Sequence, residues 1–115
     1  MNTYKPGELY LVEFDPSVGN EIQKTRPALV LGDPRHIKKM HLIPIIPLSS
    51  RVATGKQFEI PLKKNNENKL FCDSIILANQ LYTYDKKRFI KKIGHISYEE
   101  YISTLQCVGE MLGIY

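Results

Sequence analysis

Several residue types and motifs are scarce in this sequence, and their scarcity excludes whole classes of protein. The chain has no tryptophan, two cysteines, and no apolar run near the roughly 20 residues that a membrane-spanning helix needs. Cys72 and Cys107 do not form a CxxC pair, so we expect reduced thiols in the core rather than a disulfide framework. The amino terminus carries no basic stretch followed by an apolar signal core. These features predict a soluble, cytoplasmic protein with no membrane partner.

The motifs of several enzyme classes are also absent. The sequence contains no Gly-rich phosphate loop, no HExxH pair, no Cys/His ligand spacing and no nucleophile elbow. His36, His41 and His95 are scattered, and we expect each at the surface or in a strand rather than as a metal ligand or base. We therefore predict neither a metal site nor a cofactor.

The length and charge of the chain indicate one basic domain. A chain of 115 residues suits a single domain over residues 1–115. It carries 16 Lys and Arg against 12 Asp and Glu, and the basic residues cluster at 34–41, 61–69 and 85–92, interleaved with Phe, Tyr and His. Such clusters suit phosphates and stacked bases, although Lys-rich turns that serve only solubility give the same pattern.

Short apolar segments separated by turn residues predict a strand-rich fold. The strand-like segments are 8–14, 27–32, 41–48, 56–62, 72–81 and 88–96. Residues 8–14 have the period-two pattern of a strand, with Tyr10, Val12 and Phe14 on one face. Residues 27–32 and 41–48 are continuously apolar, as in strands that are buried on both faces. Pro44 and Pro47 indicate bulges, sheet edges or strand ends in the third segment.

The carboxyl-terminal segment has the pattern of a helix. Ser97 and Glu100 form a capping-box signature, and Gly113 suits the end of the helix. The apolar residues at helical spacing are Tyr98, Tyr101, Ile102, Leu105, Val108 and Leu112, which we expect in the core. The predicted fold is a strand-rich α+β domain in which this helix covers one end of the sheet.

Polar side chains lie where two of the predicted strands begin or end. Arg26 directly precedes the strand that starts at Pro27, and Ser49, Ser50 and Arg51 follow the strand at 41–48. Depending on the strand directions, these two groups emerge at one rim of the sheet or at opposite rims, and the sequence leaves both arrangements open.

If the two groups meet, they suit a phosphodiester. Arg26 and Arg51 would bind its oxygens, a serine hydroxyl would donate to the developing charge, and Lys24 or Lys56 would add positive charge. RNA cleavage could then use the 2′-OH of the substrate as the nucleophile. The alternative is a structural arginine that binds loop carbonyls, beside serines that close a turn.

Three ordered stretches resemble the MazF/PemK family of toxins. They are GELYLVEFDPSVGNEIQKTRPALVLG at 7–32, IIPLSSR at 45–51 and DSIILANQLYTYDKKRFIKKIGHIS at 73–97. The resemblance implies an SH3-like barrel with an appended helix, assembled as a homodimer. It also implies a sequence-specific, metal-independent endoribonuclease that cuts single-stranded mRNA, leaves 2′,3′-cyclic phosphate and 5′-OH ends, and is neutralised by a cognate antitoxin.

The matching motifs assign roles to single residues. The catalytic arginine of the family falls on Arg26, and its catalytic threonine falls on Ser49, with Ser50 as the alternative hydroxyl. The acidic residue of the Gly-x-Glu motif falls on Glu21, which we expect to orient Arg26. The predicted substrate-binding residues are Glu21, Lys24, Thr25, Ser50, Arg51, Lys56 and Gln80.

Two other functions compete with RNA cleavage. A relative of the same fold poisons DNA gyrase by protein contact, but such toxins rely on a carboxyl-terminal tryptophan, which this chain lacks. A non-catalytic homologue that binds nucleic acid or sequesters antitoxin would need only the basic clusters, and Arg26 would then be dispensable.

Overall fold

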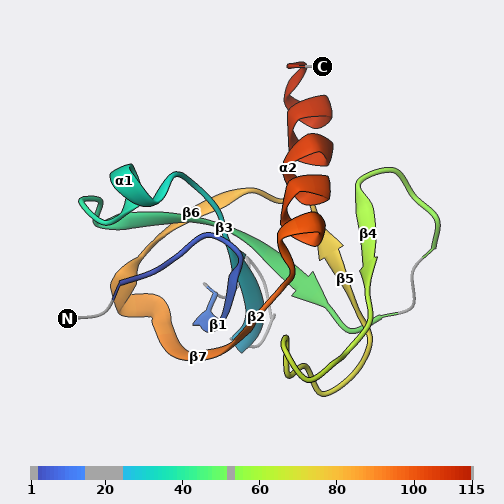
Figure 1. Ribbon diagram of the computed structural model, residues 1–115, viewed down its shortest axis with the longest axis horizontal. Coiled ribbons are helices and arrows are strands. Elements are labelled where there is room, and N and C mark those ends of the chain that lie inside the picture. The colour runs from blue at the N-terminus through green and yellow to red at the C-terminus, as the bar shows by residue number, and fades with distance from the viewer. Residues whose placement is uncertain (1–2, 15–24, 52–53, 115) are drawn as a thin grey trace, which may run out of the picture.

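The computed structural model describes residues 3–14, 25–51 and 54–114. The strands are β1 (Glu8–Glu13), β2 (Thr25–Val30), β3 (Leu42–Ser49), β4 (Glu59–Leu62), β5 (Ser74–Leu77), β6 (Tyr82–Asp85) and β7 (Phe89–His95) (Figure 1). The helices are α1 (Pro34–Ile37), the 3-10 helix η1 (Lys86–Arg88) and α2 (Tyr98–Leu112). Each of the six predicted strand segments overlaps a strand, although β2 begins two residues before its predicted segment and β3 ends one residue after its own.

The strands form one antiparallel sheet of 7 strands. Its order is β4-β5-β3-β2-β1-β7, and β6 pairs with β3 on the side that β5 also occupies (Figure 1). Within the described residues the outer strands β4 and β7 do not pair, so the sheet is barrel-like but open. The prediction of a strand-rich α+β fold with a carboxyl-terminal helix is confirmed, and the expected barrel is only partly closed.

Both faces of β1, β2 and β3 are covered, which explains their apolar sequences. One core cluster, on the side of α2, contains Leu9, Leu29, Ile46, Leu48, Ile76 and Val108. The cluster on the opposite face contains Tyr10, Val12, Ala28, Val30, Ile43 and Ile45. Because successive side chains of a strand point to opposite faces, a strand covered on both faces needs an apolar residue at nearly every position.

The two prolines of β3 lie inside an interior strand, so the expectation of an edge or a strand end is wrong. β3 has β2 on one side, and on the other side it pairs with β6 through Ile45 and with β5 from Leu48 onward. Pro47 lies where β3 changes partner, and the Pro44 carbonyl accepts the Leu31 N–H at 3.0 Å. A proline can occupy this strand because it keeps its acceptor and lacks only the donor.

The ends of α2 are those that the sequence predicts. The Glu100 N–H donates to Ser97 Oγ at 3.1 Å and the Ser97 N–H donates to Glu100 Oε1 at 2.9 Å, which completes the capping box. Gly113 ends the helix with a φ of 84°. Two residues of the predicted apolar stripe are exposed rather than in the core, because Tyr98 is 74% exposed and Leu112 is 56% exposed at the two ends of the helix. A third, Ile102, is half-buried and belongs to neither core cluster. In the described part of the chain, no helix is long and apolar enough to cross a membrane.

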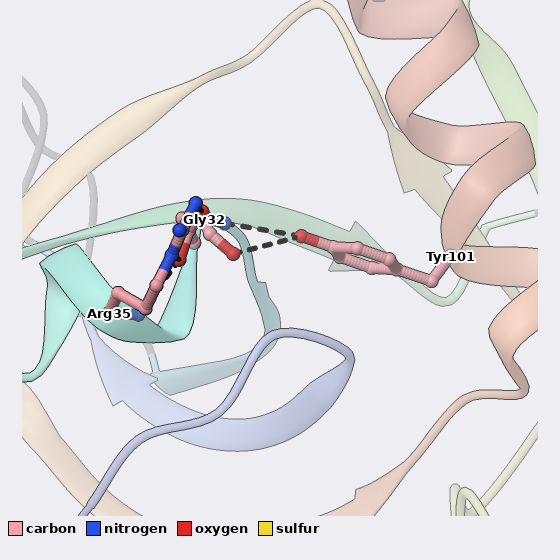
Figure 2. A network of polar contacts seen from close by, with 4 residues as sticks. Gly32, Arg35 and Tyr101 are labelled. Carbon is pink, nitrogen blue, oxygen red and sulfur yellow. Dashed lines mark hydrogen bonds and ion pairs between the residues drawn. The ribbon is translucent and has the colours of Figure 1, made fainter.

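A tyrosine of α2 connects the helix to the corner between β2 and α1. The Tyr101 hydroxyl accepts the Gly32 N–H at 3.2 Å and donates to the Gly32 carbonyl at 3.4 Å (Figure 2). Burial raises the pKa of Tyr101, which keeps the hydroxyl protonated for this bond. Gly32 has a φ of +120°, and a Cβ there would lie 2.6 Å from the Ile37 side chain. The corner therefore requires glycine.

Two short helices and one strand have no clear signal in the sequence. α1 begins after Asp33, whose side chain accepts the Arg35 N–H at 2.8 Å, with Pro34 in its first turn. Four residues are too few for a helical period to show. The strand β6 is also only four residues long, too short for its alternation of Tyr82 and Tyr84 with polar residues to stand out, and it pairs with β3.

Candidate functional site

The antiparallel pairing of β2 with β3 places the two predicted polar groups at the same rim. Ala28 lies opposite Pro47, and Val30 lies opposite Ile45. Continued toward the start of β2, this register brings Arg26 beside Ser49. Of the two arrangements that the sequence leaves open, the fold therefore adopts the one in which both groups emerge at the same rim of the sheet.

These residues line a cavity of about 370 Å³, which we call the Arg26 cavity. Its polar rim is formed by Thr25, Arg26, Ser49 and Ser50 from the ends of β2 and β3. The lining also includes Leu70, Phe71 and Cys72 from the segment before β5, and Ser74 at the start of β5. The cavity thus joins three parts of the chain that are distant in sequence.

The Arg26 side chain is exposed at this rim. Among the described residues, its guanidinium has no hydrogen-bond or ion-pair partner, whereas its backbone belongs to the β1–β2 ladder opposite Val12. A fixed backbone with an uncommitted guanidinium suits the binding of a phosphate group that enters the cavity.

Ser49 is half-buried and its hydroxyl has a fixed neighbour. The Arg51 N–H donates to Ser49 Oγ at 3.3 Å. Because a hydroxyl carries one donor hydrogen and two acceptor positions, this bond leaves the Ser49 hydrogen available for an oxygen in the cavity. Ser50 is exposed and lines the same cavity, so both candidate hydroxyls are within it.

Arg51 is engaged elsewhere. Its Nη2 donates to Glu59 Oε2 at 2.6 Å, and Glu59 also accepts the Thr54 N–H at 3.2 Å and the Thr54 hydroxyl at 3.0 Å. The Glu59 side chain is 6% exposed. The hydrogen bond from Arg51, followed by that from Thr54, holds the pKa of Glu59 below its usual range. Arg51 therefore connects the end of β3 to the start of β4.

The remaining predicted binding residues are not gathered at the cavity. Lys56 is exposed in the connection between β3 and β4, and its carbonyl accepts the Glu59 N–H at 3.3 Å. Gln80 follows β5, at the end of that strand away from Ser74 and the cavity. Glu21 and Lys24 lie outside the described residues.

Sequence reasoning missed the segment 70–74 as part of the site. Phe71 is completely exposed, and Cys72 is exposed beside it, so the expectation of a core cysteine is wrong for Cys72. The bend before β5 turns these two side chains outward, while Ser74 is buried and donates to the Cys72 carbonyl at 3.0 Å. Cys107 is half-buried against the core, and both thiols are free, as predicted. The only available signal was a lone Phe directly after a basic cluster.

Comparisons with known proteins agree with this architecture. The model of the family described as PemK-like, MazF-like toxin of type II toxin-antitoxin system matches residues 5–112. The crystal structure of MazF (Form-I) from Deinococcus radiodurans is 25% identical with a TM-score of 0.80, and the match covers 98% of this chain and 99% of that chain.

Two structures of complexes show the same fold at lower identity. A MazE-MazF structure (Form-II) from Deinococcus radiodurans is 23% identical with a TM-score of 0.80 and full coverage of both chains, 100% each. An endoribonuclease in complex with its cognate antitoxin, from Mycobacterial species, is 12% identical with a TM-score of 0.71, and the match covers 100% of this chain and 98% of that chain.

Proposed function

Because the chain belongs to the family of PemK-like, MazF-like toxins of type II toxin-antitoxin systems, whose members are endoribonucleases, we propose that it cleaves single-stranded mRNA at a specific sequence in the cytoplasm. The observation that carries this proposal is the Arg26 cavity, in which an uncommitted guanidinium lies beside two serine hydroxyls. The scissile phosphodiester binds there.

The proposed reaction uses the RNA itself as the nucleophile. The 2′-hydroxyl loses its proton as its oxygen attacks the adjacent phosphorus, and the bond from phosphorus to the 5′-oxygen breaks. The 5′-oxygen takes up a proton, so the products are a 2′,3′-cyclic phosphate and a 5′-OH with no net change in protons. Arg26 stabilises the negative charge that develops on the phosphoryl oxygens. Ser49 donates its hydroxyl hydrogen to one of the same oxygens, with Ser50 as the alternative donor.

Arg26 acts by charge rather than as a base in this scheme. A guanidinium stays protonated in proteins, and it is therefore a poor proton acceptor. Glu21 orients Arg26, as its place in the family motif implies. Thr25, which lines the cavity, completes the proposed binding set together with Lys24, Arg51, Lys56 and Gln80.

The proposal needs no metal ion or cofactor. Within residues 3–14, 25–51 and 54–114, no group of three or more His, Cys, Asp or Glu residues is placed to hold a metal ion. We predict that RNA cleavage itself does not require a metal ion.

The proposed partners are a second copy of the chain and an antitoxin. The MazE-MazF structure and the endoribonuclease bound to its cognate antitoxin support the second of these by likeness of fold. A formal charge of +4 favours both RNA and an acidic antitoxin segment as ligands of one basic surface.

Cleavage of a long RNA in EDTA tests the reaction. We expect cutting at a limited set of sites, with cyclic phosphate and 5′-OH ends, and no cutting of a matched RNA that carries a single 2′-deoxy nucleotide before the cut site. Loss of activity in EDTA that returns with Mg²⁺ would contradict metal independence. Cutting of the deoxy substrate would mean that water or a side chain attacks instead.

A further inference from the structure

Phe71 is a fully exposed aromatic ring at the border of two cavities. Its side chain is 100% exposed and lines both the Arg26 cavity and a second cavity of about 440 Å³. The two cavities also share Thr25, Pro27 and Leu70. A strand of nucleic acid that leaves the Arg26 cavity on this side must pass the Phe71 ring.

The second cavity, which we call the lysine cavity, combines positive charge with an apolar floor. Its charged residues are Lys69, Lys91 and Lys92, and Leu11 and Ile93 contribute apolar surface. Lys92 is paired with Glu8 at 2.9 Å, whereas the Lys69 and Lys91 ammonium groups have no ion-pair partner among the described residues. Two of the three basic clusters of the sequence, 61–69 and 85–92, therefore meet at one place.

The segment that carries Phe71 is held by buried polar contacts. Asn68 is fully buried, its Oδ1 accepts the N–H groups of Asn65 at 3.0 Å and Leu70 at 3.1 Å, and its Nδ2 donates to the Lys63 carbonyl at 2.8 Å. These bonds fix the backbone on the amino-terminal side of Phe71. The ring is thus presented to solvent by an ordered backbone.

The same segment is anchored on β7. The His95 N–H donates to the Glu67 carbonyl at 3.1 Å. A Cβ at Gly94 would lie 2.4 Å from the Glu67 carbonyl oxygen, so the segment rests directly on the glycine backbone. Since the backbone that carries the ring is ordered before any ligand binds, binding costs little backbone conformational entropy.

We propose that Phe71 is a base-stacking residue: it binds the nucleobase next to the phosphodiester in the Arg26 cavity, and Lys69 and Lys91 bind the phosphates beyond that base. The inference rests on the proposed function and adds a subsite to it. A single-stranded nucleic acid supplies both a planar base for the exposed ring and consecutive phosphates for the two unpaired ammonium groups, and RNA is the occupant because it is the substrate of the proposed reaction. Stacking is tolerant of base identity, so Phe71 contributes affinity rather than sequence preference.

A tryptophan at position 71 reports the stacking directly. The chain has no tryptophan, so Phe71→Trp introduces a single indole. We expect its emission to be quenched by a single-stranded 2′-O-methyl oligoribonucleotide, which lacks the attacking hydroxyl, and the quenching to be lost when the base that reaches the indole is made abasic. Tyr98→Trp is the matched control, because Tyr98 is 74% exposed on α2 and lines neither cavity.

Affinity measured with the same oligonucleotide completes the test. Phe71→Ala should weaken binding about ten- to a hundred-fold, since stacking of one base on an aromatic ring is worth about 1–3 kcal/mol. Phe71→Tyr should keep most of the affinity. Lys91→Ala should reduce the salt dependence of binding.

Four results would overturn the inference. In the first, Phe71→Ala binds the oligonucleotide as tightly as the unmodified protein does. In the second and third, quenching of the indole does not change when the base is made abasic, or poly-glutamate quenches it as strongly as RNA does. In the fourth, Phe71→Ala changes the sedimentation of the protein, which would show that a second copy covers the ring. Cleavage by the unmodified protein is measured in parallel. Cleavage with any of these results overturns the Phe71 subsite alone, whereas absence of both RNA binding and cleavage overturns the proposed function with it.

Discussion

Two arginines near Ser49 differ in what their side chains can do. Arg51 is already bound to Glu59 at 2.6 Å, so a substrate that used it would have to break this pair. Arg26 has no such partner among the described residues, and it lines the cavity. We therefore assign charge stabilisation to Arg26, and we expect Arg51 to contribute mainly by holding the connection between β3 and β4.

Arg26→Ala should remove most of the cleavage activity and leave the fold intact. Loss of one preorganised electrostatic stabiliser typically costs about 10² to 10³ in rate, and the exposed side chain packs against no core cluster. Ser49→Ala should cost less, because Ser50 offers a second hydroxyl. The measurement is single-turnover cleavage of one RNA at equal concentrations of folded protein.

Arg35→Ala is the control for the Arg26 variant because it removes the same charge from α1, which follows the other end of β2. Its partner Asp33 lies 2.7 Å away, and this pair is apart from the cavity. If both variants cleave as the unmodified protein does, the catalytic assignment of Arg26 is wrong. If both lose activity equally, net charge rather than position matters.

Glu8 should make the stability of the fold depend on pH. Burial raises the pKa of this carboxyl, but hydrogen bonds from Lys92, the Lys5 N–H and Tyr10, together with the charge of Lys92, outweigh it and leave the pKa below its ordinary value. A carboxyl with a lowered pKa binds a proton more readily in the unfolded chain. Its contribution is therefore present above the unfolded pKa and disappears as the pH falls through the folded pKa.

Urea unfolding between pH 7 and pH 3 measures this contribution. Glu8→Gln should lower the free energy of unfolding at pH 7 by about 1 kcal/mol. This is less than the usual contribution of a hydrogen bond to a charged group, because the glutamine amide can keep some of the hydrogen bonds that Glu8 accepts. The difference from the unmodified protein should shrink toward pH 3. A difference that stays constant over this range would show that Glu8 stabilises by packing alone.

At the scale of elements, the segment between β4 and β5 is packed against the sheet. It contacts the backbone of β7 at Gly94 and supplies Leu70 to the core. Its residue Lys69 has a φ of 55°, a left-handed conformation that the buried Asn68 contacts maintain. The segment can therefore form one wall of each of the two cavities.

Gly94→Ala should displace this segment and destabilise the protein by about 1–3 kcal/mol, the usual cost of overpacking. The reason is that the new methyl group would meet the carbonyl oxygens of Glu67 at 2.4 Å and Asn68 at 2.7 Å. Hydrogen exchange should also become faster at the amides of Lys69 and His95, whose bonds to Asn65 and Glu67 hold the segment.

Gly113→Ala provides the comparison for Gly94→Ala. It has a positive φ of 84° and no atom within 4 Å of the added Cβ, so its cost of about 1–2 kcal/mol comes from backbone strain at the end of α2. Exchange at Lys69 and His95 should not change in this variant. Equal exchange in both variants would mean that Gly94 is not a point of contact for the segment.

At the scale of the whole molecule, less apolar surface is left for assembly than the sequence indicates. Most of the apolar residues of the run 41–48 are already buried within the protomer, namely Ile43, Ile45, Ile46 and Leu48. The exposed large apolar residues include Leu42, Ile90, Tyr98, Leu112 and Ile114. The homodimer that we propose therefore cannot use the buried residues of this run, and the exposed Leu42 and Ile90 are among the apolar residues of the sheet that remain available to it.

Sedimentation at micromolar concentration should show a dimer, and RNA should compete with an acidic antitoxin segment for one surface. Competition is expected because Arg26 and its neighbouring cations attract either polyanion, and both affinities should fall as salt rises. Binding of both ligands at once would contradict a shared surface. A monomer that cleaves RNA at the same sites would contradict the dimer.

The sequence by itself determined most of the local elements and identified Arg26 and Ser49 as candidate site residues. The capping residues Ser97 and Glu100 and the terminal Gly113 are local signals, and their effect on α2 needs no distant contact. Continuous apolar runs likewise predicted β2 and β3, because burial on both faces constrains nearly every position. Arg26 and Ser49 were recognisable since they adjoin these two strands.

Only the tertiary structure decided which of the polar residues meet. The antiparallel pairing of β2 with β3 brings Arg26 beside Ser49, whereas the side chain of Arg51 forms an ion pair with Glu59. The approach of segment 70–74 exposes Phe71 and Cys72 beside them. These outcomes depend on strand register and on contacts between residues far apart in the chain, and a shift of one residue in register would turn every side chain of a strand to the other face.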